Sequence, residues 1–150
     1  MINNKKIIVI LPAYNEENKI GKVVSKLKTD APKEYVDLII VVDDGSTDNT
    51  VKEAQLAGAE VLIKQKNEGV GSAIRTGIKY AQKNNFDIIV VMAGDDQDVP
   101  KELPIVVNPI IYDKFDFVQG SRRLYQKQVI NIPLFRRITT KLYSWIFKII

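Results

Sequence analysis

The sequence predicts an α/β fold in which helices cover both faces of a mostly parallel sheet, giving three α/β/α layers. Short apolar runs rich in β-branched residues alternate along the chain with segments whose apolar residues recur at helical spacing. This alternation is typical of parallel strands joined by crossover helices. Polar clusters follow several of the apolar runs, at the carboxyl ends of the expected strands, where open α/β sheets bind their ligands. Because no repeat or linker interrupts the pattern, residues 1–150 are expected to form a single domain.

Five apolar runs are the expected strands. They cover residues 7–11, 38–42, 60–63, 88–92 and 115–118. The first run is continuous and rich in β-branched residues, which suits a strand that is buried on both faces of a parallel sheet. The polar residues that follow these runs are therefore expected to converge on one edge of the sheet.

Helices are expected between the strands. Asn15 can cap the first helix, whose first turn would carry Glu16 and Glu17. The apolar stripe of this helix has the spacing i, i+3, i+4 and i+7 and consists of Ile20, Val23, Val24 and Leu27. Thr47 or Asp48 can cap a short second helix.

The later helices differ in regularity. Residues 69–84 carry a regular apolar stripe. Residues 103–111 have helical spacing too, but Pro104 and Pro109 remove backbone donors, so this helix is expected to be kinked or broken. Residues 134–150 are expected to form an amphipathic helix whose charged residues are all basic.

The composition limits the available chemistry. With 45% apolar and 27% charged residues in a chain of 150, the protein has ordinary globular composition. It contains no cysteine and no histidine, which excludes disulfides, thiolate nucleophiles and imidazole acid–base catalysis. Catalysis must therefore use carboxylates, amines, guanidinium groups, hydroxyls, backbone amides or a metal with oxygen ligands.

Basic residues gather at the carboxyl end of the chain. All 18 acidic residues lie within 1–120, so the net charge of +4 arises from a wholly basic tail at 121–150. Such a tail favours an anionic partner, unless it is simply a solvated basic face. Nucleic acid is not expected, because the aromatic residues of 134–150 lie largely on its apolar side. That side can pack on a core, lie on an anionic membrane or join copies into a homo-oligomer.

The amino-terminal residues carry no targeting pattern. Residues 1–6 are polar and lead directly into an apolar run that is too short for a signal-peptide core or a membrane span. We therefore expect a cytoplasmic protein, and one that is peripheral at the cytoplasmic face of the membrane if its basic tail binds there.

Two adjacent carboxylates follow the second expected strand. Asp43 and Asp44 begin the segment Asp-Asp-Gly-Ser-Thr-Asp, and turn chemistry with helix capping can account for these residue types. Two carboxylates are nevertheless more than a turn requires. The functional interpretation is a carboxylate that accepts a hydrogen bond from a base N–H or a ribose hydroxyl.

A second acidic cluster follows the fourth expected strand. Asp95, Asp96 and Asp98 would repel one another unless a cation screens them, and their oxygen ligands suit Mg²⁺ or Mn²⁺. Such an ion would bridge to a diphosphate and neutralise charge as the leaving group departs. Acidic residues at the start of a helix are the simpler interpretation.

A glycine-containing segment precedes the helix expected at 69–84. Gly69 and Gly71 give it a backbone that can approach a phosphate or a sugar closely. The segment lacks the third glycine of a dinucleotide fingerprint and has no Walker lysine. Arg75 lies on the polar face of the helix, where it can contact a ligand or simply be solvated.

Five segments, taken together, resemble the family 2 glycosyltransferases of GT-A fold, in particular the polyprenyl-phosphate glycosyltransferases related to dolichyl-phosphate mannose synthase. In order they read LPAYNEE, VVDDGSTD, NEGVGSAIRTG, GDDQD and GSR, at residues 11–17, 41–48, 67–77, 94–98 and 120–122. The resemblance covers residues 6 to about 137, and members of the family usually continue well beyond that point.

The resemblance implies roles for individual residues. The nucleotide site would consist of Pro12, Ala13, Tyr14, Glu16, Asp43, Asp44, Gly71 and Arg75. Asp95 would bind a Mg²⁺ or Mn²⁺ ion with Gln97 nearby, and Asp95, Asp96 and Arg122 would serve catalysis. Arg122 would meet the phosphate of the acceptor or the donor. Members of the family usually have an Asp-x-Asp pair, and Ala93 stands at the position of its first aspartate.

The reaction that the resemblance implies is an inverting single displacement. A hexose would pass from a nucleotide-diphosphate sugar, of GDP-mannose or UDP-glucose type, to a polyprenyl or dolichyl phosphate. A phosphate with a second pKa of about 6 is largely ionised at neutral pH and needs no general base, so the absence of histidine is no obstacle. The alternatives are a family 2 transferase that acts on a saccharide hydroxyl and a nucleotide-sugar-binding module without turnover.

Overall fold

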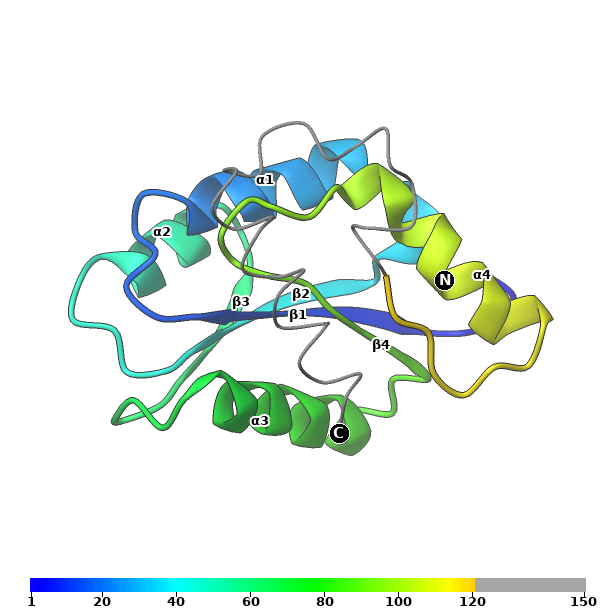
Figure 1. Ribbon diagram of the computed structural model, residues 1–150. Coiled ribbons are helices and arrows are strands. Elements are labelled where there is room, and N and C mark those ends of the chain that lie inside the picture. The colour runs from blue at the N-terminus through cyan, green and yellow to red at the C-terminus, as the bar shows by residue number, and fades with distance from the viewer. Residues whose placement is uncertain (121–150) are drawn as a thin grey trace, which may run out of the picture. The chain divides into compact units, whose positions relative to one another are not determined.

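A four-stranded parallel sheet forms the centre of the molecule (Figure 1). The structure is a computed structural model that describes residues 1–120, of which residues 1–118 pack as one unit. The strands are β1 (Ile7–Ala13), β2 (Leu38–Asp43), β3 (Glu60–Ile63) and β4 (Ile88–Val91). Their order in the sheet is β3-β2-β1-β4, and each neighbouring pair is parallel. The mostly parallel sheet that the sequence predicts is thus confirmed.

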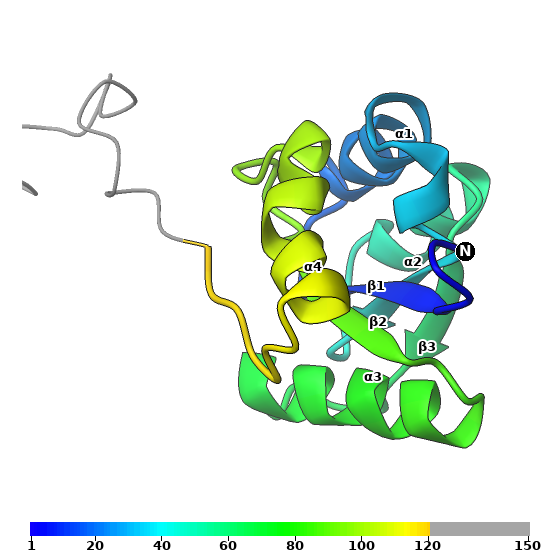
Figure 2. The same cartoon turned by 90° about the vertical axis from the view of Figure 1, so that its right-hand side faces the viewer.

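Helices cover both faces of the sheet. On one face lie α1 (Ile20–Asp30), α2 (Thr50–Leu56) and α4 (Leu103–Tyr112), and on the other lies α3 (Val70–Lys83) (Figure 2). Two short 3-10 helices, Lys33–Tyr35 and Pro100–Glu102, precede β2 and α4. The predicted three-layer α/β/α arrangement is therefore present.

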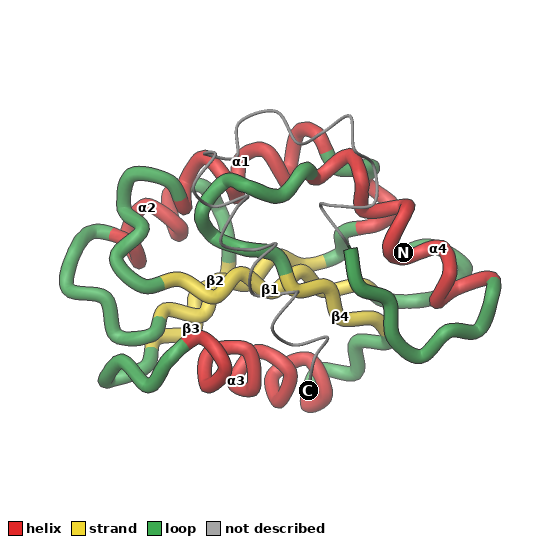
Figure 3. Tube along the Cα trace, in the orientation of Figure 1, coloured by secondary structure: helices red, strands yellow, loops and turns green. Residues whose placement is uncertain are grey.

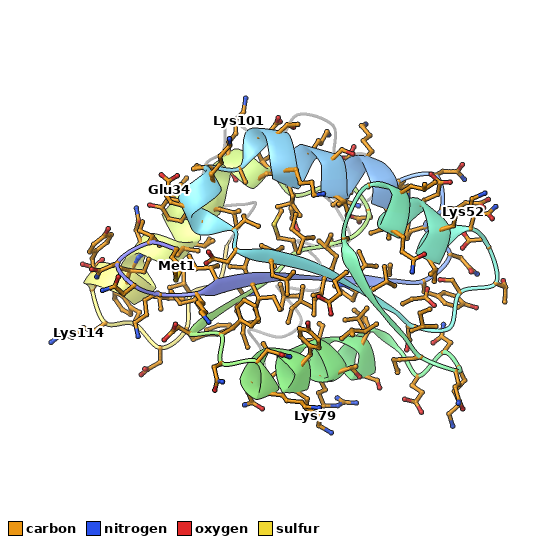
Figure 4. The ribbon with its side chains drawn as sticks, turned by 180° about the vertical axis from the view of Figure 1, so that it is seen from behind. Met1, Glu34, Lys52, Lys79, Lys101 and Lys114 are labelled. Carbon is orange, nitrogen blue, oxygen red and sulfur yellow. The ribbon has the colours of Figure 1, made fainter. Side chains whose placement is uncertain are left out.

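Alternate side chains of β1 supply the two halves of the core. Ile7, Val9 and Leu11 pack in the cluster beneath α1, α2 and α4, whereas Ile8 and Ile10 pack in the cluster beneath α3. All five are fully buried, which explains why this strand is continuously apolar. Figure 4 shows the side chains that fill the space on both sides of the sheet, while Lys79 of α3 and Lys52 of α2 point outward.

The run at 115–118, which was expected to be a fifth strand, is not one. It pairs with no strand in the described part of the chain, and Phe115 and Phe117 are 57% and 78% exposed. The alternation of aromatic residues with Asp116 provides one apolar face only, and in this structure that face packs against no core cluster. The amphipathic helix expected at 134–150 lies outside the described residues.

Two helices begin later than their sequences indicate. Asn15 does not cap α1, because its backbone is left-handed (φ +53°) and its side chain accepts a hydrogen bond from the amide of Thr47 (2.9 Å). The first turn of α1 therefore contains neither Glu16 nor Glu17. The position before α2 is occupied by Asn49, not by Thr47 or Asp48.

The fourth helix runs unbroken through both of its prolines. Pro104 lies in the first turn of α4, where a backbone N–H has no partner within the helix. Pro109 removes one bond near the end of a ten-residue helix. The expected break is absent for this reason. Within residues 1–120, none of the helices combines the length and hydropathy that crossing a bilayer requires.

Gly77 provides a test of how closely α3 packs on the sheet. A Cβ atom at this position would lie 2.6 Å from Cγ2 of Ile10, a fully buried side chain at the centre of β1. We expect Gly77→Ala to lower the free energy of unfolding by about 1–3 kcal/mol, the usual range for overpacking, when it is measured by urea denaturation.

Gly71→Ala is the matched control in the same helix. Its nearest neighbour would be Nη1 of Arg75 at 3.5 Å, an ordinary contact. This substitution should change the free energy of unfolding by no more than about 0.5 kcal/mol or stabilise the helix slightly. Equal losses in the two variants would contradict the close approach of α3 to β1.

Candidate functional site

A pocket of about 340 Å³ lies outside the carboxyl ends of the strands. Figure 3 shows the loops that follow β1, β2 and β3 at this end of the sheet. The chain leaves β1 toward β2, whereas β4 lies on the other side of β1, so the strand order reverses between β1 and β4. Open α/β sheets bind ligands outside the strand ends at such a point. The pocket has the size of small-molecule sites. It is lined by Pro12, Ala13, Tyr14, Glu16, Asp44, Asn67, Gly69, Val70, Ala73, Ala93, Gly94 and Asp95.

The loops after β1 and β2 interlock through side chains. Three successive backbone amides of the first loop donate hydrogen bonds to side chains of the second: Asn15 to Ser46 (2.9 Å), Glu16 to Thr50 (2.8 Å) and Glu17 to Asp48 (3.2 Å). In return, the side chains of Asn15 and Glu17 accept hydrogen bonds from amides of the second loop. Neither loop has helical or sheet partners here, so each satisfies the polar backbone of the other. This arrangement fixes the pocket wall that contains Tyr14 and Glu16.

Thr50 is the buried centre of this interlock. Its hydroxyl accepts from the amide of Glu16 and donates to Oδ1 of Asp48, and the residue is fully buried. Burial acts to raise the pKa of the Asp48 carboxyl, but hydrogen bonds from the hydroxyl and amide of Thr50 and from the amide of Glu17 outweigh it. The pKa of Asp48 is consequently below its ordinary value.

Asp43 closes the turn after β2 and does not line the pocket. Its carboxylate is 1% exposed and accepts a hydrogen bond from the amide of Ser46 at 3.2 Å. Gly45 in this turn has φ +77°, and a Cβ atom there would lie 2.7 Å from the backbone of Lys66. The turn therefore requires glycine at this position. Asp43 has the structural role that turn chemistry predicts.

Asp44, the neighbouring carboxylate, does line the pocket. It is 3% exposed and accepts hydrogen bonds from Nζ of Lys64 and from the amides of Glu68 and Gly69, the last at 2.7 Å. Burial acts to raise the pKa of this carboxyl, but the ammonium and the two amides stabilise the carboxylate more strongly. Its pKa is therefore lower than usual.

The segment before α3 forms another part of the pocket lining. Gly69 has φ +89°, in the left-handed region that favours glycine, and it immediately precedes the helix. Asn67, Gly69 and Val70 line the pocket. Gly71 and Arg75, two of the residues proposed from the sequence, follow within α3 and are not among the residues that line it.

The two adjacent aspartates of the loop after β4 have different surroundings: one lines the pocket and the other contacts α1. Asp95 lines the pocket, and its carboxylate accepts hydrogen bonds from the amide and the side-chain nitrogen of Gln97. Asp96 instead contacts Nζ of Lys22 (2.8 Å) and Nζ of Lys26 (2.6 Å) on α1. These two ammonium groups lower the pKa of Asp96. Asp96 thus anchors the loop to α1, a role that differs from the catalytic one expected of it.

The loop after β4 is closed by a hydrogen bond of its own, and it also lies close to β1. The amide of Ala93 donates to Oδ2 of Asp98 (2.8 Å). At Gly94, a Cβ atom would lie only 3.1 Å from the carbonyl oxygen of Pro12, so a small residue allows the loop to approach β1 closely. These contacts bring Asp95 to the same pocket as Asp44.

The donors at Asp95 suit a metal ion that shares its coordination with a ligand. In the described part of the chain, no three acidic side chains are placed to hold an ion by themselves. Mg²⁺ is typically held by one or two carboxylates together with phosphate oxygens and water. The Asp95 carboxylate and the Gln97 side chain fit this kind of site, in which a diphosphate would complete the coordination.

The structure brings together only part of the predicted site. Six of the predicted residues line the pocket: Pro12, Ala13, Tyr14, Glu16, Asp44 and Asp95. Asp43, Asp96, Gln97, Gly71 and Arg75 lie outside its lining, and Arg122 lies outside the described residues. Lys64, the partner of Asp44, was not predicted. Its position directly after β3, at the same edge of the sheet, is the signal that could have identified it.

The chain is similar in sequence to several known glycosyltransferases. Residues 8–149 match the sequence model of the family described as Glycosyl transferase family 2. The UDP-N-acetylglucosamine–dolichyl-phosphate N-acetylglucosaminyltransferase of Methanococcus voltae is 37% identical over 152 aligned positions, which cover 90% of this chain and 59% of that protein. The dolichol-phosphate mannosyltransferase of Pyrococcus furiosus is 32% identical over 140 residues, which cover 91% of this chain and 38% of that protein.

A solved structure shares the fold. The glucosyl-3-phosphoglycerate synthase of Mycobacterium tuberculosis, in complex with Mn²⁺, uridine diphosphate and glucosyl-3-phosphoglycerate, matches with a TM-score of 0.63 and 30% identity. The match covers 73% of this chain and 40% of the synthase. The chain therefore spans between about two fifths and three fifths of the length of these three proteins.

The lowered pKa of Asp48 predicts how stability depends on pH. A carboxyl whose pKa is lower in the folded state contributes stability above its unfolded pKa of about 4, and this contribution is lost as pH falls through the folded pKa. The free energy of unfolding, measured by urea denaturation from pH 7 to pH 3, should therefore decrease toward acid. Asp48→Asn should be less stable by about 1 kcal/mol at pH 7 and should show a shallower pH dependence.

Asp116→Asn is the control, since this side chain lies in an exposed segment after α4. It should leave both the stability at pH 7 and the pH dependence close to those of the wild type. A wild-type pH dependence in Asp48→Asn would show that the interlock does not depend on the charged form of Asp48.

Proposed function

We propose, on the premise that this chain belongs to glycosyl transferase family 2 and has the GT-A fold, that its pocket binds a nucleotide-diphosphate hexose and that the hexose passes to the phosphate of a polyprenyl acceptor. The donor would be of GDP-mannose or UDP-glucose type. The observation that carries the proposal is that Asp44 and Asp95, from loops more than 50 positions apart in the sequence, line one pocket of suitable size.

The two walls of the pocket suit the two ends of the donor. Tyr14 is 45% exposed and offers an aromatic face beside Pro12, against which a base could stack. Asn67 and Gly69, which also line the pocket, offer an amide side chain and an open backbone to the ribose and phosphates. Asp95 lies on the loop after β4, where the diphosphate would meet an ion.

Asp95 and Gln97 would hold a Mg²⁺ or Mn²⁺ ion. When bound, this ion would neutralise the charge that develops on the departing nucleoside diphosphate. The complex of the related synthase with Mn²⁺ and uridine diphosphate supports a divalent ion beside the nucleotide. Ala93 leaves the site with one carboxylate fewer than the family's usual Asp-x-Asp pair, so the diphosphate would supply a larger share of the ligands.

The proposed chemistry is an inverting displacement. An oxygen of the acceptor phosphate forms a bond to the anomeric carbon of the hexose while the bond from that carbon to the nucleoside diphosphate breaks on the far side. The acceptor phosphate is already ionised at neutral pH, so no side chain has to remove a proton. The role of the protein is to bind both partners in line and to exclude water.

A phosphate acceptor fits the structure better than a saccharide hydroxyl. A hydroxyl would need a general base. Asp96 and Asp98 are the candidates beside Asp95, but Asp96 is paired with Lys22 and Lys26, and Asp98 accepts a hydrogen bond from the amide of Ala93. The names of the relatives from Methanococcus voltae and Pyrococcus furiosus also refer to dolichol phosphates. A polyprenyl acceptor would place the site at a membrane surface, on the cytoplasmic side. Ala93 keeps a second candidate open, a nucleotide-sugar-binding module without turnover.

Titration with uridine and guanosine diphosphates, with and without Mn²⁺, tests the proposed donor site. We expect one of the two nucleotides to bind, and to bind more tightly with Mn²⁺. Asp95→Ala should weaken the Mn²⁺-dependent binding at least tenfold, which corresponds to about 1.4 kcal/mol, while binding without the ion stays the same.

Asp116→Ala, which removes an exposed carboxylate away from the pocket, should bind like the wild type. Failure of the wild type to bind any nucleotide would overturn the proposal. Binding without release of nucleoside diphosphate from the matching sugar nucleotide, in the presence of polyprenyl phosphate, would favour the module without turnover.

A further inference from the structure

We infer that Lys64 is a positioning residue, which acts through Asp44 to hold the segment 67–69 in the shape that the nucleotide pocket requires. The inference rests on the proposed function for the identity of the ligand. It assigns to Asp44 a task that differs from direct binding of the base or ribose. Neither Lys64 nor this task follows from the motifs in the sequence.

The ammonium group of Lys64 contacts three acceptor groups. The side chain is 12% exposed, and Nζ donates to Oδ1 of Asp44 and to Oγ of Ser72 (2.8 Å) and lies 3.1 Å from Oε2 of Glu68. An ammonium has three N–H donors, so these three acceptors use its whole capacity. The donors of Lys64 are therefore all used by acceptors of the protein, and none is left to bind a phosphate.

The carboxylate of Asp44 is similarly engaged. Besides the Lys64 ammonium, it accepts hydrogen bonds from the amides of Glu68, at 3.1 and 3.2 Å, and Gly69, at 2.7 Å. Both of its oxygens therefore have partners within the protein. With 3% of the residue exposed, little of its acceptor capacity faces the pocket. A nucleoside would consequently meet the segment that Asp44 holds rather than Asp44 alone.

These contacts join three elements of the fold at the pocket wall. Asp44 follows β2, Lys64 follows β3, and Ser72 belongs to the first turn of α3. The hydroxyl of Ser72 also donates to Glu68 (3.0 Å), which closes a ring of contacts around the start of the helix. Within this ring the backbone of Gly69 adopts φ +89° and places Asn67 and Val70 in the pocket lining.

Loss of the Lys64 ammonium would leave Asp44 as a buried carboxylate without its cation. Removing one partner of a buried ion pair is costly because the remaining charge is uncompensated. The segment 67–69 would then be released, either because Asp44 takes up a proton or because it turns toward water. In both cases its hold on the Glu68 and Gly69 amides weakens.

The test compares Lys64→Met with Lys66→Met. Lys66 is two positions further along the same loop, and its side chain is 78% exposed and 3.6 Å from Glu68, so its removal deletes the same charge without touching Asp44. Hydrogen exchange of individual backbone amides, measured by NMR without ligand, is the first readout. Affinity for uridine and guanosine diphosphates with Mn²⁺, by calorimetry, is the second.

We expect Lys64→Met to accelerate exchange of the Glu68 and Gly69 amides at least tenfold, with no comparable change in β1, and to weaken nucleotide binding at least tenfold. Lys66→Met should match the wild type in both measurements. If Lys64→Met does not fold, Lys64→Gln, which keeps a hydrogen-bond donor beside Asp44 but removes the charge, takes its place in the comparison.

Unchanged exchange of the two amides in Lys64→Met would overturn the inference, and so would accelerated exchange with wild-type affinity. If the wild-type protein binds neither nucleotide, the proposed function fails. The exchange measurement, which uses no ligand, would still decide whether Lys64 holds the segment 67–69.

Discussion

Burial of β1 on both of its faces determines where the pocket lies. β1 packs against helices on both faces and has β2 and β4 as its neighbours, so it lies in the interior of the sheet. The register aligns Ala13 with Asp43, so β1 and β2 end at the same level. Chain segments that are distant in the sequence thereby meet at one edge, and the apolar core rather than any polar contact brings them there.

Polar contacts then fix the shape of the loops at that edge. The amides of residues 15–17 have no partners in a helix or strand, and side chains of the loop after β2 accept their hydrogen bonds. Asp44 performs the same task for the segment 67–69. An abundance of Asp, Asn, Ser and Thr in such loops therefore reflects the need to satisfy backbone amides as much as the need to bind a ligand.

The sequence predicts the layers and most of the elements because hydrophobic periodicity reports burial directly. Hydrophobic periodicity does not predict helix boundaries that depend on contacts between loops. The start of α1 is one such boundary, because the left-handed conformation of Asn15 depends on Thr47, which is distant in the sequence. The position of Lys64 directly after β3 indicates the sheet edge, but its pairing with Asp44 is visible only in the folded structure. Pocket residues that directly follow a strand and belong to a sequence motif, such as Tyr14, were predicted. Strand topology alone brings them to the edge of the sheet.

In each of the two pairs of adjacent aspartates, one carboxylate lines the pocket and the other makes a contact within the protein. At the extended end of β2, consecutive side chains point in opposite directions, so Asp43 and Asp44 cannot readily face one ligand. Asp95 and Asp96 lie instead in a turn after β4, in which Asp96 has a left-handed backbone (φ +65°). Asp43 closes the turn after β2 while Asp44 lines the pocket, and Asp96 pairs with α1 while Asp95 lines the pocket. The sequence identifies both pairs but not the member that faces the ligand. That choice depends on the register of the strand end and on where the lysines of neighbouring elements lie.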